Sequence, residues 1–263
     1  MILILGGTSE SKEITVMLVR EGYKIIACAA TTYGGSLLKE AGANEVIQQR
    51  LSERELATLI QARGIRFLID ATHPFAELVT VYAQRACQQT GIPYIRYERP
   101  SCTIPEHVLI HRVQGYTAAA KKAVKLANKT VFVTTGTKTL SVFYHEAQSQ
   151  GKRVVARILP DLEGLKLCLG LGIPPGDIIA MQGPFSIAMN KILLDEFKAG
   201  VLVTKDSGTV GGTAAKIEAA LSLSIPVVLI DRPISVQDSA CCSVNNSDQL
   251  LTKILYLERN DCK

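Results

Sequence analysis

The stretch LIDATHPFA, which begins at residue 68, places polar chemistry where an apolar run ends. The run stops at Asp70, and Ala71, Thr72 and His73 follow before a proline. Since ligands of parallel α/β sheets bind at the carboxyl ends of the strands, we expect these four residues to rim a binding site. His73 can bind a cofactor, orient a substrate or pass a proton near neutral pH, and we favour binding over acid catalysis. The alternative is that Asp70 or Thr72 only caps the helix that follows.

The first turn of the chain, GGTSE, has the residue types of a phosphate-binding turn. Gly6 and Gly7 let the backbone turn tightly and approach a phosphate, and the helix after them offers free N–H groups and the positive end of its dipole. Thr8 or Ser9 could cap that helix. The third glycine of the G-x-G-x-x-G fingerprint is absent, so a tight turn without a ligand is the alternative. Its position after the first strand favours a nucleotide.

The second apolar run ends in AATTYGG, where NAD-binding proteins commonly place a carboxylate for the ribose hydroxyls. Thr31 and Thr32 stand there instead, without an Asp or Glu. Hydroxyls without a carboxylate favour a 2′-phosphate, so we predict NADPH as the cofactor and leave NADH open.

Three strand ends in the second half carry a cation, namely Lys138 in TTGTKTL, Arg157 in ARILP and Lys205 in TKDSG. Each cation alone is also compatible with a solvated surface residue. Their shared position beside glycines favours a site that grips carboxylates or phosphates. The candidate substrate-binding residues of this half are Thr135, Gly136, Lys138, Arg157, Gln182, Gly183, Ser186, Lys205, Asp206, Ser207 and Gly208.

Short β-branched runs alternate with helical patterns along the chain, which predicts parallel sheets covered by helices on both faces. The predicted helices include 9–21, 52–63 and 75–89. The predicted strands are 2–5, 24–30, 45–47, 66–70, 93–97, 130–135, 153–158, 177–181, 201–205 and 226–231.

The two halves of the chain resemble one another. Both begin with a strand, a Gly-Thr turn and a helix, and GIPYIRYERP closes the first half as SIPVVLIDRP closes the second. We infer a divergent doubling into two Rossmann-like α/β domains with a cleft between them. The predicted domains are 1–105, which binds the dinucleotide, and 106–263, which binds the substrate.

Composition excludes several classes of protein. The chain has 263 residues, 47% of them hydrophobic, and a net charge of +5 without a Lys/Arg block, so we expect no nucleic-acid partner. No apolar run approaches the roughly 20 residues of a membrane span.

Seven cysteines without a C-x-x-C pair predict reduced thiols in a cytoplasm, and the four histidines lack the spacing of a metal site. Y-x-x-x-K, G-x-S-x-G and P-loop motifs are absent, which disfavours short-chain dehydrogenases, hydrolases and nucleoside triphosphatases.

The ordered set ILGGTSE, ATTYGG, DATHPFA, GIPYIRYERP, TTGTKTL, QGPFS, VTKDSG and IPVVLIDRP resembles the precorrin-6A or cobalt-precorrin-6A reductase family of the corrin (vitamin B12) pathway. The resemblance spans residues 4–233, and the tail after Cys241 carries no matching motif. It implies that a hydride passes from NADPH, or NADH, to a ring double bond of precorrin-6A or its cobalt complex, which gives the precorrin-6B product. The tetrapyrrole's acetates and propionates would explain the basic strand ends. The resemblance also implies transient contacts with neighbouring enzymes of the pathway.

The residues take roles under this resemblance. Gly6, Gly7 and Thr8 would hold the pyrophosphate, Thr31 and Thr32 the adenosine ribose, and Asp70, Ala71, Thr72 and His73 the nicotinamide end. Tyr33 and Gly34 would contact either ligand, and the candidates of the second half would line the tetrapyrrole. His73 is the first candidate for the proton partner of the hydride, with water as its rival. The alternative functions are a nucleotide-sensing module without turnover and another NAD(P)H reductase that acts on a polycarboxylate.

Overall fold

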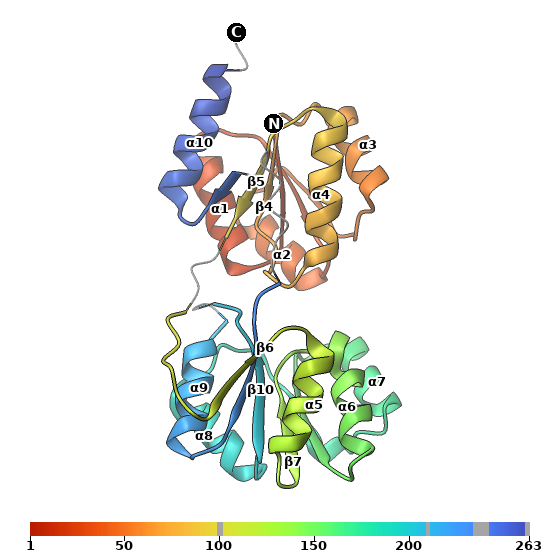
Figure 1. Cartoon of the computed structure of the whole chain (residues 1–263). Helices are drawn as coiled ribbons and strands as arrows, with labels where there is room; N and C mark the ends of the chain where they lie inside the picture. Colours follow the sequence, from red (N-terminus) through yellow and green to blue (C-terminus); the bar gives the residue numbers. More distant parts are fainter. Residues whose placement is uncertain (99–101, 209–210, 234–241, 261–263) are drawn as a thin grey trace. The chain divides into compact units, whose positions relative to one another are not determined.

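The chain folds into two compact units, each built around its own parallel sheet (Figure 1). The computed structural model describes residues 1–98, 102–208, 211–233 and 242–260. Unit 1 comprises Met1–Pro100 together with Ile234–Lys263, and unit 2 comprises Ser101–Pro233.

Unit 1 contains a six-stranded parallel sheet with the order β12-β5-β4-β1-β2-β3. Its strands are β1 (Ile2–Gly6), β2 (Ile25–Ala29), β3 (Glu45–Ile47), β4 (Phe67–Asp70), β5 (Tyr94–Tyr97) and β12 (Cys242–Val244). Its helices are α1 (Ser9–Arg20), α2 (Thr32–Glu40), α3 (Glu53–Arg63), α4 (Glu77–Thr90) and α10 (Ser247–Asn260).

Apolar strands explain why both faces of this sheet are covered. One face packs against residues from α1, α2 and α10, including Leu18, Leu38 and Ile254, all of which are fully buried. The other face packs against α3 and α4 through residues such as Leu56 and Ala83. Figure 1 shows α1 and α10 on one side of this sheet and α3 and α4 on the other. With both faces closed, the edge at the carboxyl ends of the strands is left to carry polar residues.

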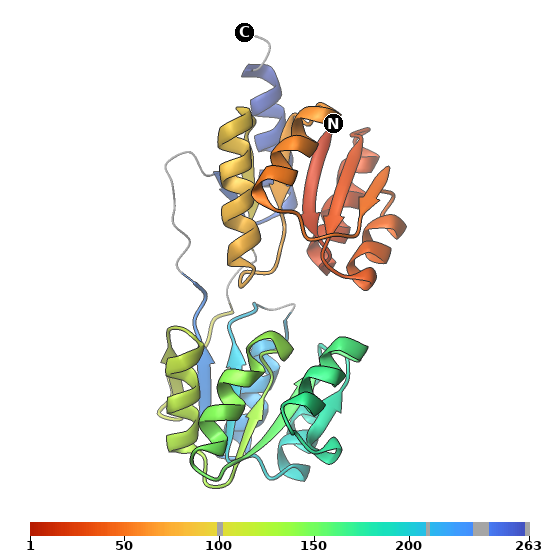
Figure 2. The same cartoon turned by 90° about the vertical axis from the view of Figure 1, so that its right-hand side faces the viewer.

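Unit 2 contains a second six-stranded parallel sheet with the order β6-β11-β10-β7-β8-β9 (Figure 2). Its strands are β6 (Ile110–Val113), β7 (Thr130–Val133), β8 (Arg153–Ile158), β9 (Ile178–Ala180), β10 (Val201–Lys205) and β11 (Val227–Ile230). Its helices are α5 (Tyr116–Leu126), α6 (Leu140–Gln148), α7 (Leu162–Gly170), α8 (Ile187–Glu196) and α9 (Thr213–Ser222), with short 3-10 turns η1 (Thr137–Thr139) and η2 (Pro175–Asp177). Leu194 of α8 and Ile217 of α9 pack on one face of the sheet.

The strand orders of the two sheets correspond position by position. In each sheet three successive strands run one way from the first strand, and the next two lie on its other side, so the order reverses between β1 and β4 and again between β7 and β10. This confirms the predicted α/β class with two Rossmann-like domains and agrees with the inferred doubling. All ten predicted strands are present, with ends that shift by at most two residues.

Two edge strands and one boundary differ from the prediction. β6 and β12 escaped the sequence analysis because IHRV is interrupted by charge and CSV has only three residues. β12 pairs in parallel with β5, so the end of the chain returns to unit 1. The predicted second domain, 106–263, was therefore wrong for its last residues. Arg99 and Pro100, which support the internal repeat, and Cys241 lie outside the described residues.

Within the described ranges no helix combines the length and the apolarity that crossing a membrane requires.

Candidate functional site

The β1–α1 turn of unit 1 lies where the strand order reverses, at the predicted nucleotide position. Gly7 has φ of +103°, a conformation that side chains other than glycine rarely adopt. Thr8 caps α1, and its hydroxyl accepts from the Ser11 N–H at 3.3 Å. The same hydroxyl donates to the Ala71 carbonyl at 3.3 Å, which ties this turn to the end of β4. The two sequence stretches that we expected at one edge therefore lie in contact.

Gly7 and Gly34 allow two backbone segments to meet. A Cβ on Gly34 would stand 2.8 Å from the Gly7 Cα, and a Cβ on Gly7 would stand 3.2 Å from the Gly34 Cα. Thr31 caps α2 by accepting from the Gly34 N–H at 3.0 Å, and Thr32 and Tyr33 are exposed. Gly34 thus has a packing role, whereas Tyr33 presents its ring to solvent.

The amides of the first turn already have an oxygen acceptor. The Gly7 and Thr8 N–H groups both donate to Ser11 Oγ at 2.9 Å. The Ser11 hydroxyl in turn donates to the Thr8 carbonyl at 2.7 Å. Gly6 makes room for this arrangement, since a Cβ there would lie 2.3 Å from Ser11 Cβ. An anion oxygen that bound these two amides would replace the serine hydroxyl, and the sequence analysis did not foresee this competitor.

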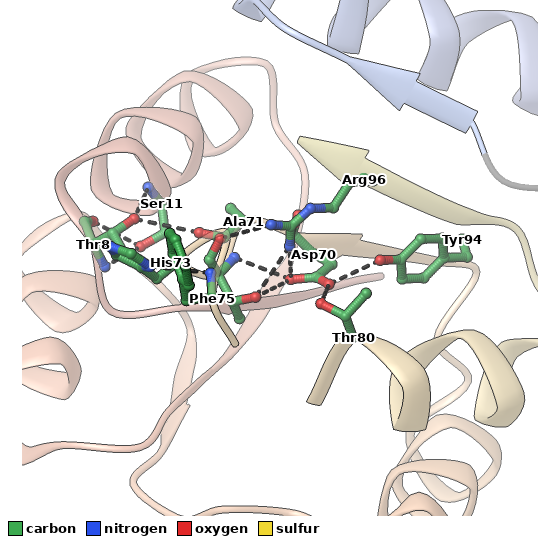
Figure 3. Close-up of polar contacts among 10 residues, drawn as sticks. Thr8, Ser11, Asp70, Ala71, His73, Phe75, Thr80, Tyr94 and Arg96 are labelled. Atoms are coloured by element: carbon green, nitrogen blue, oxygen red, sulfur yellow. Dashed lines mark hydrogen bonds and ion pairs between the residues drawn. The ribbon is translucent and has the colours of Figure 1, made fainter. Parts of the chain in front are cut away.

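Asp70 is the centre of a buried polar network at the end of β4 (Figure 3). Its side chain is fully buried and forms an ion pair with Arg96 at 2.7 Å. The Thr72 hydroxyl donates to Oδ1 at 2.6 Å, while the Thr80 and Tyr94 hydroxyls donate to Oδ2 at 2.7 and 2.8 Å.

That Asp70 lies at the nicotinamide end of the cofactor stays a prediction, but this network gives its side chain a role within the protein. Both carboxylate oxygens are occupied by protein donors, so the side chain positions the loop. Arg96 also donates to the Thr72 hydroxyl at 3.1 Å and to the Thr72 carbonyl at 3.1 Å. Asp70 and Arg96 together fix the backbone that leads to His73.

His73 lies in that loop, half-buried, with its ring 5.7 Å from the Phe75 ring. Its Nδ1 accepts from the Phe75 N–H at 3.2 Å, and its carbonyl accepts from the Ala76 N–H at 2.8 Å. Because Nδ1 is an acceptor, a neutral His73 carries its hydrogen on Nε2. Figure 3 shows the His73 ring on the Thr8 side of the network and Arg96 on the other.

In unit 2 the β7–α6 turn lies where the strand order reverses, at the position that the β1–α1 turn has in unit 1. Thr134 donates from its N–H and its hydroxyl to the Val203 carbonyl at 3.0 and 2.9 Å, which fixes the turn against β10. Thr135 is buried and shares a hydrogen bond of 3.1 Å with the Thr139 hydroxyl. Gly136 has φ of +87°, and Lys138 is exposed in η1. Thr135 therefore holds the turn, and Lys138 is the residue of this turn that presents a charge.

Arg157 at the end of β8 is held by neutral partners. It donates to Asn190 Oδ1 at 2.8 Å, and its guanidinium lies 4.9 Å from the centre of the Phe185 ring. The Asn190 amide donates to the Phe185 and Ser186 carbonyls at 3.1 and 2.8 Å, so the acceptor of the arginine is fixed. Burial lowers the pKa of Arg157 to about 10, so the side chain stays charged at neutral pH.

Two lysines of unit 2 also have lowered pKa values, the half-buried Lys205 and the buried Lys216. Burial, and then the charge of Lys138, lowers the pKa of Lys205 to about 8. Burial, followed by the charges of Arg157 and Lys205, lowers the pKa of Lys216 to about 7. We call Lys138, Arg157, Lys205 and Lys216 the basic cluster. Such depressed pKa values are what a set of like charges withdrawn from water produces.

The loop after Lys205 contains two further predicted residues, Asp206 and Ser207. Asp206 is buried, accepts from the Gly208 N–H at 3.3 Å and has Arg232 Nε 3.6 Å from Oδ2. Ser207 is also buried, and its hydroxyl lies 3.1 Å from that of Thr213. Both side chains hold the loop, and their contact with a substrate stays a prediction.

The remaining predicted residues lie in the loop between β9 and α8. Gln182 and Gly183 are exposed, and Gly183 precedes a cis proline. Ser186 caps α8 and accepts from the Met189 N–H at 3.2 Å. This loop approaches α9, since a Cβ on Gly212 would lie 3.2 Å from Pro184 Cβ.

Sequence reasoning missed the side chains that act through these loops. They are Ser11, Thr80, Tyr94, Arg96, Phe185, Asn190, Thr213 and Lys216. One signal was readable for Lys216, because it falls on the apolar face of its helix with Thr213, Ile217 and Ala220, all buried. Arg96 offered another, since it interrupts the apolar run of β5. Among the described residues no three His, Cys, Asp or Glu side chains gather as a metal site requires.

Comparison with known proteins identifies the family. The family model described as precorrin-6x reductase CbiJ/CobK matches residues 1–254. The chain is 36% identical over 263 residues to the cobalt-precorrin-6A reductase of Methanothermobacter thermautotrophicus, covering 98% of this chain and 85% of the relative. It is 37% identical to the enzyme of that name from Priestia megaterium, covering 89% and 91%. A solved CobK precorrin-6A reductase matches 97% of this chain and 96% of its own at a TM-score of 0.79 and 26% identity. The chain therefore belongs to the precorrin-6x reductase (CbiJ/CobK) family, which comprises oxidoreductases of cobalamin biosynthesis.

Proposed function

We propose that this chain reduces cobalt-precorrin-6A to cobalt-precorrin-6B with NADPH. Unit 1 binds the dinucleotide in this proposal, and unit 2 binds the tetrapyrrole through its carboxylates. The observation that carries the proposal is the contrast between the two strand-end edges. The edge of unit 1 offers glycines and hydroxyls, and the buried Asp70 at the end of β4 is neutralised by Arg96, whereas the edge of unit 2 offers the basic cluster.

The residues of unit 1 fit a dinucleotide. The positive φ of Gly7 and the close approach of Gly34 give the β1–α1 turn a backbone that a pyrophosphate could approach. The N-terminus of α1 directs its dipole to the same turn. Binding at the Gly7 and Thr8 amides would require Ser11 Oγ to turn away, which a serine rotamer change accomplishes.

The end of β2 supports NADPH over NADH. Thr31 and Thr32 stand at the N-terminus of α2, and no carboxylate follows β2. A 2′-phosphate there meets hydroxyls and the positive end of a helix dipole, whereas a ribose without phosphate lacks its usual carboxylate acceptor.

The residues of unit 2 fit a polycarboxylate. Lys138 is exposed, Arg157 is held by Asn190 at the end of β8, and Lys205 lies at the end of β10, with β7 between these two strands. Acetate and propionate groups of a tetrapyrrole would supply the negative charge that burying these cations calls for.

The chemistry is divided between cofactor and protein. A bound reduced nicotinamide supplies the hydride. The chain binds both reactants, orients them and withdraws the cations from water, which strengthens their interaction with carboxylates. His73 is the protein group proposed to hold the proton, on Nε2, because Phe75 occupies Nδ1. A water molecule is the rival donor.

The names of the relatives favour a cobalt-containing substrate. The two relatives at 36% and 37% identity are both named cobalt-precorrin-6A reductase, whereas the solved structure at 26% identity is named precorrin-6A reductase. We therefore place cobalt-precorrin-6A first and metal-free precorrin-6A second.

An anaerobic assay of NADPH oxidation with each of the two substrates tests the proposal. We expect turnover with cobalt-precorrin-6A, and we expect Lys205→Met to raise its KM by about one to two decades while leaving the KM for NADPH unchanged. Lys166→Met is the matched control, since its side chain is 73% exposed. Binding of NADPH without oxidation of it in the presence of either substrate would instead favour a nucleotide-sensing module.

A further inference from the structure

Lys216 is an unusual residue for the inner face of a helix. It lies in the first turn of α9, and only 8% of it is exposed. Its helix neighbours on the same face, Thr213 and Ile217, are 0% and 2% exposed. Lysine is almost never buried to this extent without a partner, because the ammonium loses its hydration.

No protein anion compensates this charge within the described residues. The side chain of Lys216 has neither an ion pair nor a hydrogen bond to a carboxylate there. The ionisable groups that act on it are Arg157 from β8, Lys205 from β10 and Cys102 from the segment before β6. Two of these three are cations, and the third is a thiol whose own pKa is raised by burial. Lys216 therefore sits in a positive environment.

Like Lys216, Arg157 has no negatively charged partner in the contacts described. Its hydrogen-bond acceptor is the neutral Asn190 amide, and its face lies against the Phe185 ring. Neither contact neutralises the guanidinium, yet both fix its position. A rigid arginine and a buried lysine beside it are the components of a site for an external anion.

The protonation of Lys216 depends on what occupies this place. With its pKa lowered to about 7, a substantial fraction of the amine is neutral in the free protein near neutral pH. A carboxylate that arrives beside it favours the ammonium form and raises the pKa again. Arg157 keeps its charge throughout, since its pKa stays at about 10.

We propose that Lys216 and Arg157 form a subsite for one carboxylate of the substrate, and that Lys216 takes up a proton from solvent when this carboxylate binds. The proposal rests on the proposed function, since it assigns one part of the polycarboxylate to this pair. No covalent bond changes in the step. The carboxylate arrives ionised, solvent supplies one proton to Nζ, and an ammonium–carboxylate pair results. Arg157 provides the fixed charge, and Lys216 provides the charge that appears on binding.

Calorimetry with uroporphyrin, a stable tetrapyrrole that carries acetate and propionate groups, tests the subsite. Titrations at pH 8 in buffers of different ionisation enthalpy report the protons taken up. We expect Lys216→Met to bind about 10- to 100-fold more weakly. We expect Lys216→Arg to bind with nearly wild-type affinity but to take up about one proton fewer, because the guanidinium is already charged. If Lys216 had only a structural role, Lys216→Arg would not lower the proton uptake while keeping the affinity.

Lys166→Met serves as the matched control, and its affinity and proton uptake should equal those of the wild type. Equal proton uptake by wild type and Lys216→Arg would overturn the proposal, as would the absence of uroporphyrin binding. A second measurement needs no ligand. After reductive methylation with 13C-formaldehyde, one lysine resonance that is missing from Lys216→Arg should titrate well below pH 9. A Lys216 resonance that titrates near 10 would also overturn it.

These outcomes separate the subsite from the reaction. Proton uptake that depends on Lys216, without oxidation of NADPH by cobalt-precorrin-6A, would support the subsite and refute the proposed function. Turnover of cobalt-precorrin-6A without proton uptake that depends on Lys216 would support the proposed function and refute the subsite.

Discussion

The two units place different electrostatics at equivalent positions of the same fold. At the end of β4 the buried carboxylate of Asp70 meets Arg96, two threonine hydroxyls and a tyrosine hydroxyl, so its charge is matched inside the protein. At the end of β10, Lys205 belongs to the basic cluster with Arg157 and Lys216, and burial lowers the pKa of all three cations. The comparison teaches that a repeated strand order fixes where a site lies, and that the charges at the edge decide what it binds.

The turns after β1 and β7 also differ, because only the turn after β1 is closely packed. Both carry a glycine with positive φ, Gly7 and Gly136. A Cβ on Gly7 would press on Gly34, whereas a Cβ on Gly136 would meet nothing within 4 Å. The turn of unit 1 is packed against α2, while the corresponding turn of unit 2 is open and leads to Lys138.

Asp70→Ala should have the largest effect, because it leaves the buried guanidinium of Arg96 without its anion. We expect a loss of about 3–5 kcal/mol in the free energy of unfolding. Asp206→Ala in unit 2 is the comparison, since Asp206 has fewer and longer contacts, at 3.3 and 3.6 Å, and should lose less. Urea unfolding of both variants measures the difference. Equal losses would show that the two networks are equivalent after all.

Lys216→Met should stabilise the protein in the absence of substrate. The pKa of Lys216 is about 7 in the folded state against 10.5 for a lysine in water, so unfolding takes up a proton between these pH values. The penalty on the folded state is therefore complete below pH 7 and disappears as the pH rises toward 10.5. We expect a gain of roughly 2–4 kcal/mol at pH 6.

Thermal unfolding from pH 6 to 10 checks this prediction. Lys12→Met in unit 1 is the control, because Lys12 is partly exposed and pairs with Glu40 at 2.9 Å. Its effect on stability should be within about 1 kcal/mol. A gain from Lys216→Met that did not shrink with rising pH would contradict the assigned cause.

Gly34→Ala should weaken NADPH binding by about 1–3 kcal/mol, the usual range for overpacking. The new Cβ would lie 2.8 Å from the Gly7 Cα, so the backbone of the first turn must shift. Fluorescence titration with NADPH measures the affinity, and uroporphyrin affinity should stay unchanged because unit 2 is untouched. Gly170→Ala is the control, as its Cβ meets nothing within 4 Å. Equal NADPH affinity in both variants would remove the Gly7–Gly34 approach from the cofactor site.

Thr31→Asp should have the smallest effect on binding, and it tests directly where the 2′-phosphate lies. In unit 2 the cap after β8 is Asp161, which accepts from the Gly164 N–H at 2.7 Å, so a carboxylate can replace Thr31 as a cap. Stability should therefore stay within about 0.5 kcal/mol. The added charge should repel a 2′-phosphate and lower NADPH affinity roughly tenfold relative to NADH, about 1.4 kcal/mol. An unchanged NADPH-to-NADH ratio would place the 2′-phosphate elsewhere.

The sequence by itself determined the alternation of strands and helices, the two-fold repeat and the edges that carry chemistry. These follow from local patterns: apolar runs of four to six residues, turn glycines and polar residues directly after strands. The glycine turn and the basic strand ends were readable for the same reason, since glycines and polar residues directly after an apolar run mark where a strand ends.

Only the tertiary structure decided which polar residues are exposed at the ends of the strands and which are buried in the scaffold. Asp70, Asp206 and Ser207 looked like site residues because they follow strands, yet all three are buried among protein donors or acceptors. The burial of Lys216 and the ion pair of Arg96 with Asp70 depend on segments far away in the chain, which the sequence analysis did not assign to these residues. The return of β12 to unit 1 was equally invisible, because pairing of an edge strand depends on a partner that its own three residues do not specify. Burial and pairing are properties of the assembled sheet, whereas a sequence pattern reports only the local preference of the backbone.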